Sequence, residues 1–310
     1  WNLRTHRTVA CAPAHAGQSV LAVLPVSRER VLSHGRDGFV RLWDVTNALR
    51  TVVSEVTVPT SGFCPAALQT MGNGPDGASA DVPADAANRP RVVALPGADA
   101  QAVTLWDVRE PSIVQTLHAS STLGPSGMCM CLRFGSADAL LAGWEDGSLE
   151  LFDLRAGRSR ARAKIHSEPL LCMDVDVCAK FALTGAADRR LCLTPLDLAS
   201  TSSETTDARC LGEPETATLP VTNEASGSGG IAALCLRPDR RIFASGGWDK
   251  RIRIWQRRNL KPLAVIHHHT GTVNAVHFST CSRWLLSGSE DRTLALWSLY
   301  SGEGEIRDGG

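Results

Sequence analysis

The stretch Ser287-Gly-Ser-Glu-Asp-Arg-Thr-Leu-Ala-Leu-Trp297 joins a tight-turn sequence to an apolar run that ends in an aromatic residue. Aspartate favours turns because its side chain accepts hydrogen bonds from turn amides and tolerates unusual backbone angles. The run from Thr293 to Trp297 is typical of a strand. The stretch therefore predicts a strand that enters a hairpin turn at Asp291 and a second strand that ends at Trp297.

The same form recurs along the chain. Apolar strands that contain or end in an aromatic residue are found at 41–45, 104–108, 150–154, 253–255 and 295–299. The aromatic positions Trp1 and Trp43, Phe152 and Thr194, and Trp255 and Trp297 are each 42 residues apart. An Asp stands six residues before the aromatic position at Asp37, Asp146, Asp249 and Asp291, and Asp188 stands six before Thr194, where the Trp is lost. Asp99 precedes Trp106 by seven. The chain is therefore an array of similar β units.

This period resembles the spacing of roughly 40–45 residues in WD-repeat proteins. The fold class that the resemblance implies is all-β: a seven-bladed WD-repeat β-propeller with the first blade truncated at the N-terminus. Trp1 falls at the aromatic position of that first blade, and we expect about one repeat of roughly 40 residues to be missing before it. Residues 1–310 are expected to form a single propeller domain.

Two intervals between aromatic positions are longer than the period. They contain segments 72–90, rich in Gly, Ala, Asp and Pro, and 199–230, rich in Ser, Thr, Glu and Gly. Such compositions predict surface loops rather than domain boundaries. In the blade that contains Thr194, we expect strands at 170–177, 180–184 and 191–193, and an outer strand at 210–211.

In WD-repeat proteins the turn Asp belongs to a buried network with a His before the blade, a Ser or Thr in the second strand, and the Trp indole. By resemblance, His269, Ser287 or Ser289, Asp291 and Trp297 form this network in the last blade. His166, Thr184 and Asp188 form a version without the Trp. The other residues expected in such networks are Asp37, Trp43, Asp146, Asp249 and Trp255.

The composition indicates a globular protein without a global electrostatic field. The 32 basic and 32 acidic residues balance, so nothing in the net charge attracts phosphate backbones or anionic membranes. The ten cysteines stand mostly in apolar runs, which suits free thiols in a reducing compartment. No apolar run reaches the length of a membrane span, and the N-terminus has no signal-peptide pattern. These features predict an intracellular protein.

The motifs of the later blades resemble one branch of WD-repeat proteins more closely. They are Gly246-Gly-Trp-Asp-Lys-Arg-Ile-Arg-Ile254, Leu236-Arg-Pro-Asp-Arg240 and Leu140-Leu-Ala-Gly-Trp-Glu-Asp-Gly-Ser148. This branch is the family of guanine nucleotide-binding protein β-subunit-like protein 1 and the fungal ASTRA-associated protein 1. The resemblance implies a scaffold in the cytoplasm and nucleus that works with phosphatidylinositol 3-kinase-related kinases, through maturation co-chaperones, and with a chromatin-linked assembly. It implies no nucleotide binding.

No pattern predicts an enzyme, a metal or a cofactor. His267, His268 and His269 are adjacent, so in a strand they point to opposite faces and do not converge on one ion. The segment 227–230 has the glycines of a phosphate loop but lacks the Lys-Ser/Thr that follows them, and we interpret it as a linker. No Cys-x-x-Cys pair is present. The expected partners are proteins, with no membrane, no small-molecule substrate and no nucleic acid.

Propellers bind partners through residues beside the turn between the second and third strands. The predicted protein-binding residues are Trp248, Trp144, Lys250, Glu145, Arg36 and Glu290. Trp248 ranks first and Trp144 second, because an exposed Trp is costly unless a partner covers it and Trp is a common interface anchor. The alternative is that one or both indoles pack against neighbouring turns.

Two further patterns leave alternatives open. Trp106-Asp-Val-Arg109 and Phe152-Asp-Leu-Arg155 resemble the docking box of substrate receptors of cullin-RING ubiquitin ligases, although Asp-x-Arg is also common in charged turns. A basic cluster is formed by Arg251, Arg253, Arg257, Arg258 and Lys261. Without further aromatic residues it favours a solvated face or an acidic protein partner over nucleic acid.

Overall fold

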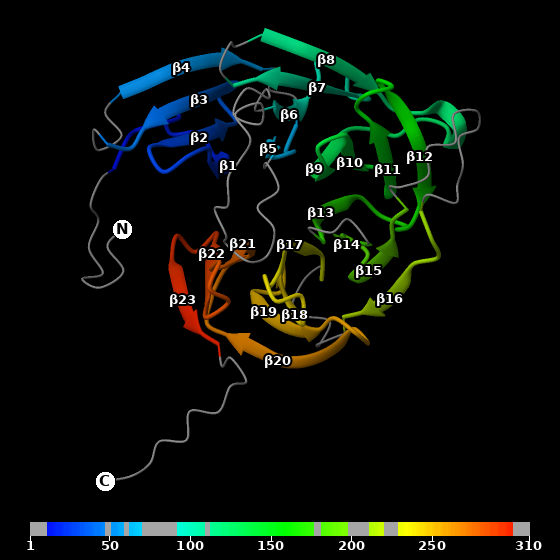
Figure 1. The fold of residues 1–310 in the computed structure, drawn as a ribbon. Coiled ribbons are helices and arrows are strands. Elements are labelled where there is room, and N and C mark those ends of the chain that lie inside the picture. The colour runs from blue at the N-terminus through cyan, green and yellow to red at the C-terminus, as the bar shows by residue number, and fades with distance from the viewer. Residues whose placement is uncertain are drawn as a thin grey trace, which may run out of the picture.

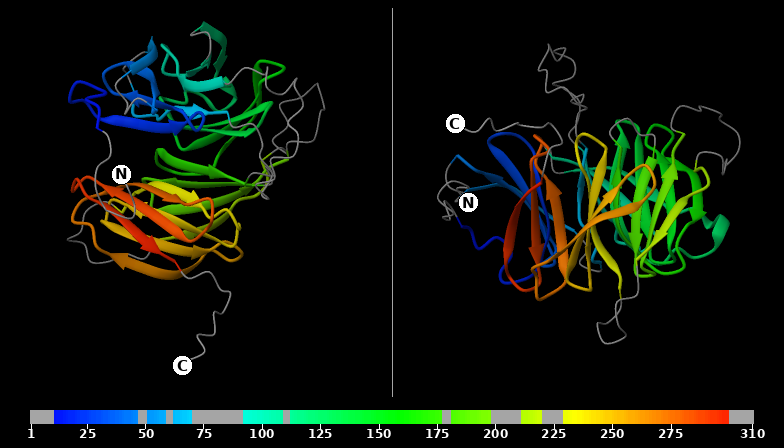
Figure 2. Two further views of the ribbon diagram at one scale, coloured as in Figure 1. Left: turned by 60° about the vertical axis from the view of Figure 1, so that its left-hand side comes forward. Right: turned by 90° about the horizontal axis from the view of Figure 1, so that it is seen from below.

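The computed structural model describes residues 11–46, 51–58, 62–69, 92–108, 112–176, 181–197, 211–219 and 229–299. Within these ranges the chain forms six antiparallel sheets arranged around a ring (Figure 1). In each sheet the first strand lies nearest the centre of the ring and the last strand lies at its rim. Seen from the side, the turns between strands lie at the two opposite faces of this ring (Figure 2). The fold is an all-β propeller.

The six sheets follow one another in sequence. Sheet 1 contains β1 (Val20–Pro25), β2 (Arg30–Gly35), β3 (Phe39–Asp44) and β4 (Thr51–Thr57). Sheet 2 contains β5 (Ala67–Leu68), β6 (Val92–Pro96), β7 (Ala102–Asp107) and β8 (Ser112–His118). Sheet 3 contains β9 (Cys129–Ser136), β10 (Ala139–Trp144), β11 (Ser148–Asp153) and β12 (Arg158–Lys164).

The later sheets repeat this order. Sheet 4 contains β13 (Leu170–Val175), β14 (Phe181–Ala186), β15 (Arg190–Pro195) and β16 (Glu215–Thr218). Sheet 5 contains β17 (Ile231–Leu236), β18 (Ile242–Gly247), β19 (Arg251–Gln256) and β20 (Lys261–His267). Sheet 6 contains β21 (Val273–Phe278), β22 (Trp284–Ser289) and β23 (Leu294–Ser298). A short 3-10 helix at Ser121–Leu123 precedes β9.

The turn between the second and third strands has the same conformation in five sheets. The residue after the turn Asp has a positive φ in each: Gly38, Gly147, Arg189, Lys250 and Arg292, with φ between 64° and 86°. Glycine adopts this left-handed conformation freely, whereas Arg and Lys adopt it at a cost. The surrounding hydrogen bonds must therefore hold the turn in sheets 4, 5 and 6.

The core lies between neighbouring sheets, because both faces of most strands are covered. Leu32 and Val40 of sheet 1 pack with Val93 of sheet 2, and Leu149 of sheet 3 shares a cluster with Leu170 of sheet 4. Similar clusters join sheets 2 and 3, sheets 4 and 5, and sheets 5 and 6. This explains the strand sequences that are apolar on both faces.

The expectation of seven blades is wrong, since the described residues form six. The expectation counted a blade built on Trp1, which lies outside the described residues. Among the described residues, no apolar cluster joins sheet 6 to sheet 1. The face of sheet 6 turned away from sheet 5 instead exposes Trp284, Leu286, Leu294 and Leu296. In the part of the chain that the structure describes, apolar clusters therefore fill five interfaces between neighbouring sheets.

The outer strand of sheet 4 does not lie where the sequence suggested. The strand is β16, Glu215–Thr218, which pairs with β15, whereas Leu211 makes only an isolated bridge to Leu196. The apolar character of 210–211 favoured that segment. The strand that pairs with β15 is polar instead, because one face of a strand at the rim is in contact with solvent. Most of the predicted loop 199–230 and all of 72–90 lie outside the described residues.

Candidate protein-interaction surface

The turn of sheet 6 is held by a buried hydrogen-bond network. His269 Nδ1 lies 3.0 Å from Asp291 Oδ2, and His269 Nε2 lies 2.8 Å from Ser287 Oγ. The indole N–H of Trp297 donates to the same Ser287 Oγ at 3.0 Å. The Ser289 hydroxyl oxygen instead accepts the backbone N–H of Asp291. Of the two candidate serines, Ser287 is thus the one that contacts His269.

Sheet 1 contains an equivalent network, of which sequence reasoning identified only Asp37 and Trp43. His15 Nδ1 lies 2.8 Å from Asp37 Oδ1, and Ser33 Oγ lies 2.8 Å from both His15 Nε2 and Trp43 Nε1. The spacing of the repeat could have identified His15, because His15 precedes Trp43 by 28 residues, the same separation as between His269 and Trp297. Arg41 adds an ion pair to Asp37 at 2.7 Å.

Sheet 4 keeps the network without the Trp. His166 Nδ1 lies 3.0 Å from Asp188 Oδ2, and its Nε2 lies 3.0 Å from Thr184 Oγ1. Burial lowers the pKa of His166, and the nearby Asp188 carboxylate partly opposes that shift. Thr194 occupies the Trp position, and its buried hydroxyl has no hydrogen-bond partner among the described residues.

Arginine replaces the histidine in sheets 3 and 5. Arg253 of β19 donates to both carboxylate oxygens of Asp249, and Trp255 donates to Ser245 Oγ at 2.8 Å. In sheet 3, Arg162 of β12 donates to Asp146 Oδ2 at 2.8 Å and to Ser148 Oγ at 2.9 Å. Both guanidinium groups are almost completely buried. A planar guanidinium suits this role because it donates several hydrogen bonds in a fixed geometry.

We call the end of the ring that carries these turns the Asp-turn face. It is formed by turns 36–38, 145–147, 187–189, 248–250 and 290–292 and by the segments that lead into the next sheets. Because a buried network anchors the turn Asp in sheets 1, 3, 4, 5 and 6, the exposed residues beside it are presented on a rigid support.

Trp248 is half-buried on this face. Its backbone N–H donates to Gly230 O at 2.9 Å, and a Cβ atom at Gly230 would lie 2.6–2.9 Å from three ring atoms of the indole. One side of the indole therefore packs on the backbone of Gly230. In the same way, a Cβ at Gly229 would lie 2.4 Å from Cδ of Arg189. Arg189 of sheet 4 and Trp248 of sheet 5 thus pack on two consecutive glycines.

Of the other predicted residues of this face, Lys250 belongs to the same turn as Trp248, whereas Glu290, Glu145 and Arg36 lie in the turns of sheets 6, 3 and 1. Lys250 and Glu290 are exposed beside their turns. Glu145 accepts the backbone N–H of Met128 at 3.0 Å, which ties the sheet 3 turn to the preceding segment. Arg36 stacks on the ring of Phe63 with 4.4 Å between Cζ and the centroid. Phe63, which is 56% exposed, was missed because nothing in its local sequence distinguishes it.

The expectation that Trp144 is exposed is wrong, because Trp144 is completely buried. It packs with Cys129, Leu140 and Phe152 in the cluster between sheets 2 and 3. Trp144 stands two residues before its turn Asp, whereas Trp248 stands one residue before. Successive strand residues point to opposite sides, so this offset turns the Trp144 indole into the core.

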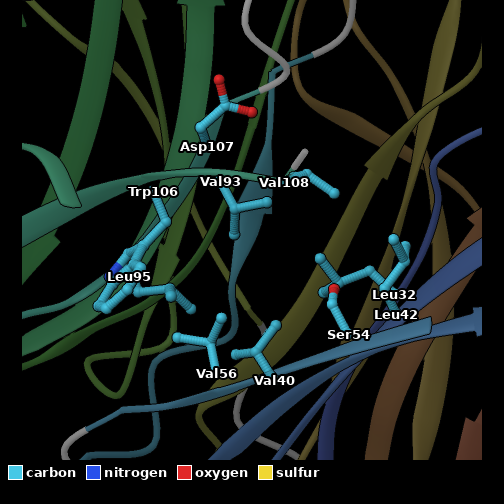
Figure 3. Close-up of a pocket in the computed structure, with 10 residues that line it drawn as sticks. All are labelled: Leu32, Val40, Leu42, Ser54, Val56, Val93, Leu95, Trp106, Asp107 and Val108. Carbon is cyan, nitrogen blue, oxygen red and sulfur yellow. The ribbon is translucent and has the colours of Figure 1, made fainter. Parts of the chain in front are cut away.

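Within the described ranges, no three His, Cys, Asp or Glu side chains come together to bind a metal ion. His267 and His268 are exposed, and the His268 ring meets Trp297 edge-on. An apolar cavity of about 30 Å³ lies between sheets 1 and 2 (Figure 3), lined by Leu32, Val40, Leu42, Val93, Leu95 and Trp106 among others. Ligand sites are about tenfold larger or more. No helix in the described ranges is long and apolar enough to cross a membrane.

The repeated sheets and their Asp-centred turns define the class of protein, a WD-repeat β-propeller. The WD domain, G-beta repeat model matches residues 219–256 and 260–298. A chain in a crystal structure of the mitotic checkpoint complex has the same fold, with a TM-score of 0.71, 18% identity, and coverage of 97% of this chain and 81% of that one.

Sequence relatives define the family within this class. Guanine nucleotide-binding protein subunit beta-like protein 1 of Mus musculus is 32% identical, over 97% of this chain and 84% of the mouse protein. ASTRA-associated protein 1 of Verticillium alfalfae is 23% identical, with the same two coverages. The chain therefore belongs to the family of guanine nucleotide-binding protein subunit beta-like protein 1.

Proposed function

We propose that the protein is a non-catalytic scaffold that acts as a co-chaperone or assembly factor for phosphatidylinositol 3-kinase-related kinases and belongs to a chromatin-linked, ASTRA-type complex. The observation that carries this proposal is the similarity along 97% of the chain to proteins named ASTRA-associated protein 1. The expected locations are the cytoplasm and the nucleus. The partners are proteins, without nucleic acid, a membrane or a small-molecule substrate.

The binding surface that we propose is the sector of the Asp-turn face around Trp248. The Trp248 indole is held on Gly230 yet half-exposed, so it presents a rigid apolar surface at a low entropic cost. Lys250 belongs to the same turn as Trp248, and Arg189 packs on Gly229, the neighbour of Gly230. Trp248 supplies the apolar anchor and the two cations supply orientation.

The test is affinity purification of the tagged full chain from cells, followed by mass spectrometry. Kinase-maturation co-chaperones and chromatin-assembly subunits should co-purify with the wild type. Trp248→Ala should reduce their recovery at least about tenfold, which corresponds to 1.4 kcal/mol or more, a usual effect for an interface Trp. Arg28→Ala, an exposed residue at the opposite end of sheet 1, is the matched control.

Trp248 also packs on Gly230, so lost binding could reflect lost folding. Trp248→Phe, which keeps a ring over Gly230, separates the two causes because it should fold like the wild type and retain part of the binding. Recovery of none of these partners by the folded wild-type chain would contradict the proposed function. Unchanged recovery with Trp248→Ala would contradict the proposed surface.

A second candidate function is that of a substrate receptor of a cullin-RING ubiquitin ligase. One observation favours it: the Arg155 side chain is 79% exposed at the end of sheet 3 opposite the Asp-turn face, where it pairs with Asp138 at 2.8 Å. Arg109, its counterpart, lies outside the described residues. A cullin adaptor that co-purifies with the wild type and is lost from the Arg109→Ala, Arg155→Ala double variant would support this function over the first.

A further inference from the structure

Basic residues gather at the end of sheet 5 opposite the Asp-turn face. Two turns meet there, 237–241 between β17 and β18, and 257–260 between β19 and β20. The backbone N–H of Arg257 donates to Arg241 O at 3.0 Å, which places the two turns side by side. Segments 237–241 and 257–261 together contain six basic residues and one acidic residue, Asp239. We call Arg240, Arg241, Arg257, Arg258 and Lys261 the basic patch.

This patch differs from the basic cluster suggested by the sequence. Arg253 is almost completely buried, and its guanidinium pairs with Asp249 near the opposite end of the strand. Arg251 also stands near that end, at the first position of β19. Only Arg257, Arg258 and Lys261 of the expected cluster belong to the basic patch. The fold adds Arg240 and Arg241 from a turn that precedes them by 16 or more residues.

The charge of the basic patch is mostly uncompensated. The Asp239 carboxylate accepts hydrogen bonds from the Arg237 guanidinium and from the Arg241 backbone N–H. Asp176 forms an ion pair with Arg240 at 3.7 Å. Within the described ranges, no carboxylate lies within 4.0 Å of the side-chain nitrogens of Arg241, Arg257, Arg258 or Lys261. Arg241, Arg258 and Lys261 are exposed. Their free N–H groups therefore point to a partner that supplies acceptors.

One member of the basic patch is held in place before any partner binds. The Arg257 guanidinium lies over the ring of Phe181 in sheet 4, with 5.1 Å between Cζ and the centroid. A guanidinium stacked on an aromatic face keeps its N–H edge available for carboxylates. The basic patch therefore reaches the border of sheets 4 and 5, and its Arg257 donor is oriented by Phe181, beside the exposed donors of Arg241, Arg258 and Lys261.

We propose that the basic patch binds a segment of a protein partner rich in Asp and Glu, at a surface distinct from the Asp-turn face. Charge complementarity carries this proposal, since carboxylates form bidentate hydrogen bonds with guanidinium groups. Single-stranded nucleic acid would require exposed aromatic residues for base stacking, but the aromatic ring that contacts the patch, Phe181, is 5% exposed and covered by Arg257.

The test measures binding of a fluorescein-labelled deca-glutamate peptide to the full chain by fluorescence anisotropy. Binding by the wild type should weaken about tenfold or more between 50 and 300 mM salt, as screening predicts. Arg241→Glu with Arg258→Glu should weaken binding at least about tenfold at low salt. The matched control is Arg28→Glu with Arg30→Glu, which reverses two exposed arginines on the same end of sheet 1 and should leave binding unchanged.

Three results would overturn the proposal: no binding of the peptide by the folded wild type, equal weakening by the control variant, or tighter binding of a ten-nucleotide thymidine strand that also depends on Arg241 and Arg258. Circular dichroism checks that both variants fold. If the charge-reversed variant does not fold, Arg241→Gln with Arg258→Gln replaces it, and an unchanged affinity in that variant would equally overturn the proposal.

Discussion

His15 Nδ1 lies 2.8 Å from Oδ1 of Asp37, a residue 22 positions further along the chain. The same separation of 22 residues joins His166 to Asp188 and His269 to Asp291. In each case the second ring nitrogen meets a Ser or Thr in the second strand. This repeated relationship holds the segment entering a sheet against its turn.

Loss of the central hydroxyl should destabilise the protein. Ser287→Ala removes the partner of both His269 Nε2 and Trp297 Nε1, which are buried or half-buried. Leaving two such groups unsatisfied should lower the free energy of unfolding by about 2–4 kcal/mol, as measured by urea denaturation. Ser289→Ala loses only a bond to a turn amide and should cost about 1 kcal/mol. Equal losses in the two variants would argue against the network.

Acid should destabilise the protein through His34. Burial, and then the charge of His15, lower the pKa of His34 from 6.5 to about 4. Between pH 6.5 and 4, the His34 side chain is therefore protonated in the unfolded state but neutral in the folded state. The free energy of unfolding falls as the pH decreases through this range. One pKa unit corresponds to about 1.4 kcal/mol, so the full loss is roughly 3 kcal/mol below pH 4.

The check is urea denaturation at a series of pH values. His34→Asn retains an acceptor for the Ala66 backbone N–H, which the wild-type Nδ1 accepts at 3.2 Å, but does not titrate. Its stability should therefore decline less between pH 6.5 and 4 than that of the wild type. An identical pH dependence would assign the acid sensitivity to other groups.

Two arginines of sheet 3 should differ sharply in their effect on stability. Arg162→Met leaves the Asp146 carboxylate without its buried partner and should cost about 3–5 kcal/mol. Arg155→Ala removes an ion pair exposed to water and should cause no measurable change. Thermal unfolding followed by circular dichroism compares them. Similar melting temperatures for the two variants would contradict the structural role of Arg162.

Gly230→Ala should impair partner binding indirectly, by displacing the Trp248 side chain. The added Cβ would lie 2.6–2.9 Å from three ring atoms of Trp248, so the indole must move. Recovery of the partners should fall about as far as with Trp248→Ala. Gly62→Ala, where the Cβ would meet nothing closer than 3.8 Å, should bind normally. Normal binding by Gly230→Ala would show that the position of the indole is unimportant.

Cysteine reactivity should separate exposed from buried thiols. Burial raises the pKa of Cys192 to about 11 and that of Cys235 to about 12, whereas the Ser279 hydroxyl lowers the pKa of exposed Cys281. Because the thiolate is the nucleophile, iodoacetamide at pH 8 should modify Cys281 in the native protein and the other two only in urea. Peptide mass spectrometry measures this, and rapid native labelling of Cys235 would contradict the packed core.

The repeat predicted the third strand of each described sheet and the Asp turn that precedes it. The spacing from Asp291 to Trp297 predicted a hairpin because its cause is local: the Asp291 carboxylate accepts the backbone N–H of Thr293, two residues away. The same local chemistry made the turns at Asp37, Asp188 and Asp249 recognisable. It also supported the WD-repeat class, and the motifs of sheets 3 and 5 indicated the family.

The tertiary structure decided what depends on contacts between residues far apart. The burial of Trp144 and the replacement of a histidine by Arg162 from the outer strand follow from packing across strands and sheets, and the described residues form six sheets rather than the expected seven. The contact of Trp248 with Gly230, and the meeting of Arg241 with Arg257, likewise join segments that no spacing rule connects. Local hydrogen bonds are encoded within a few residues, whereas a surface forms only when the ring brings distant turns together.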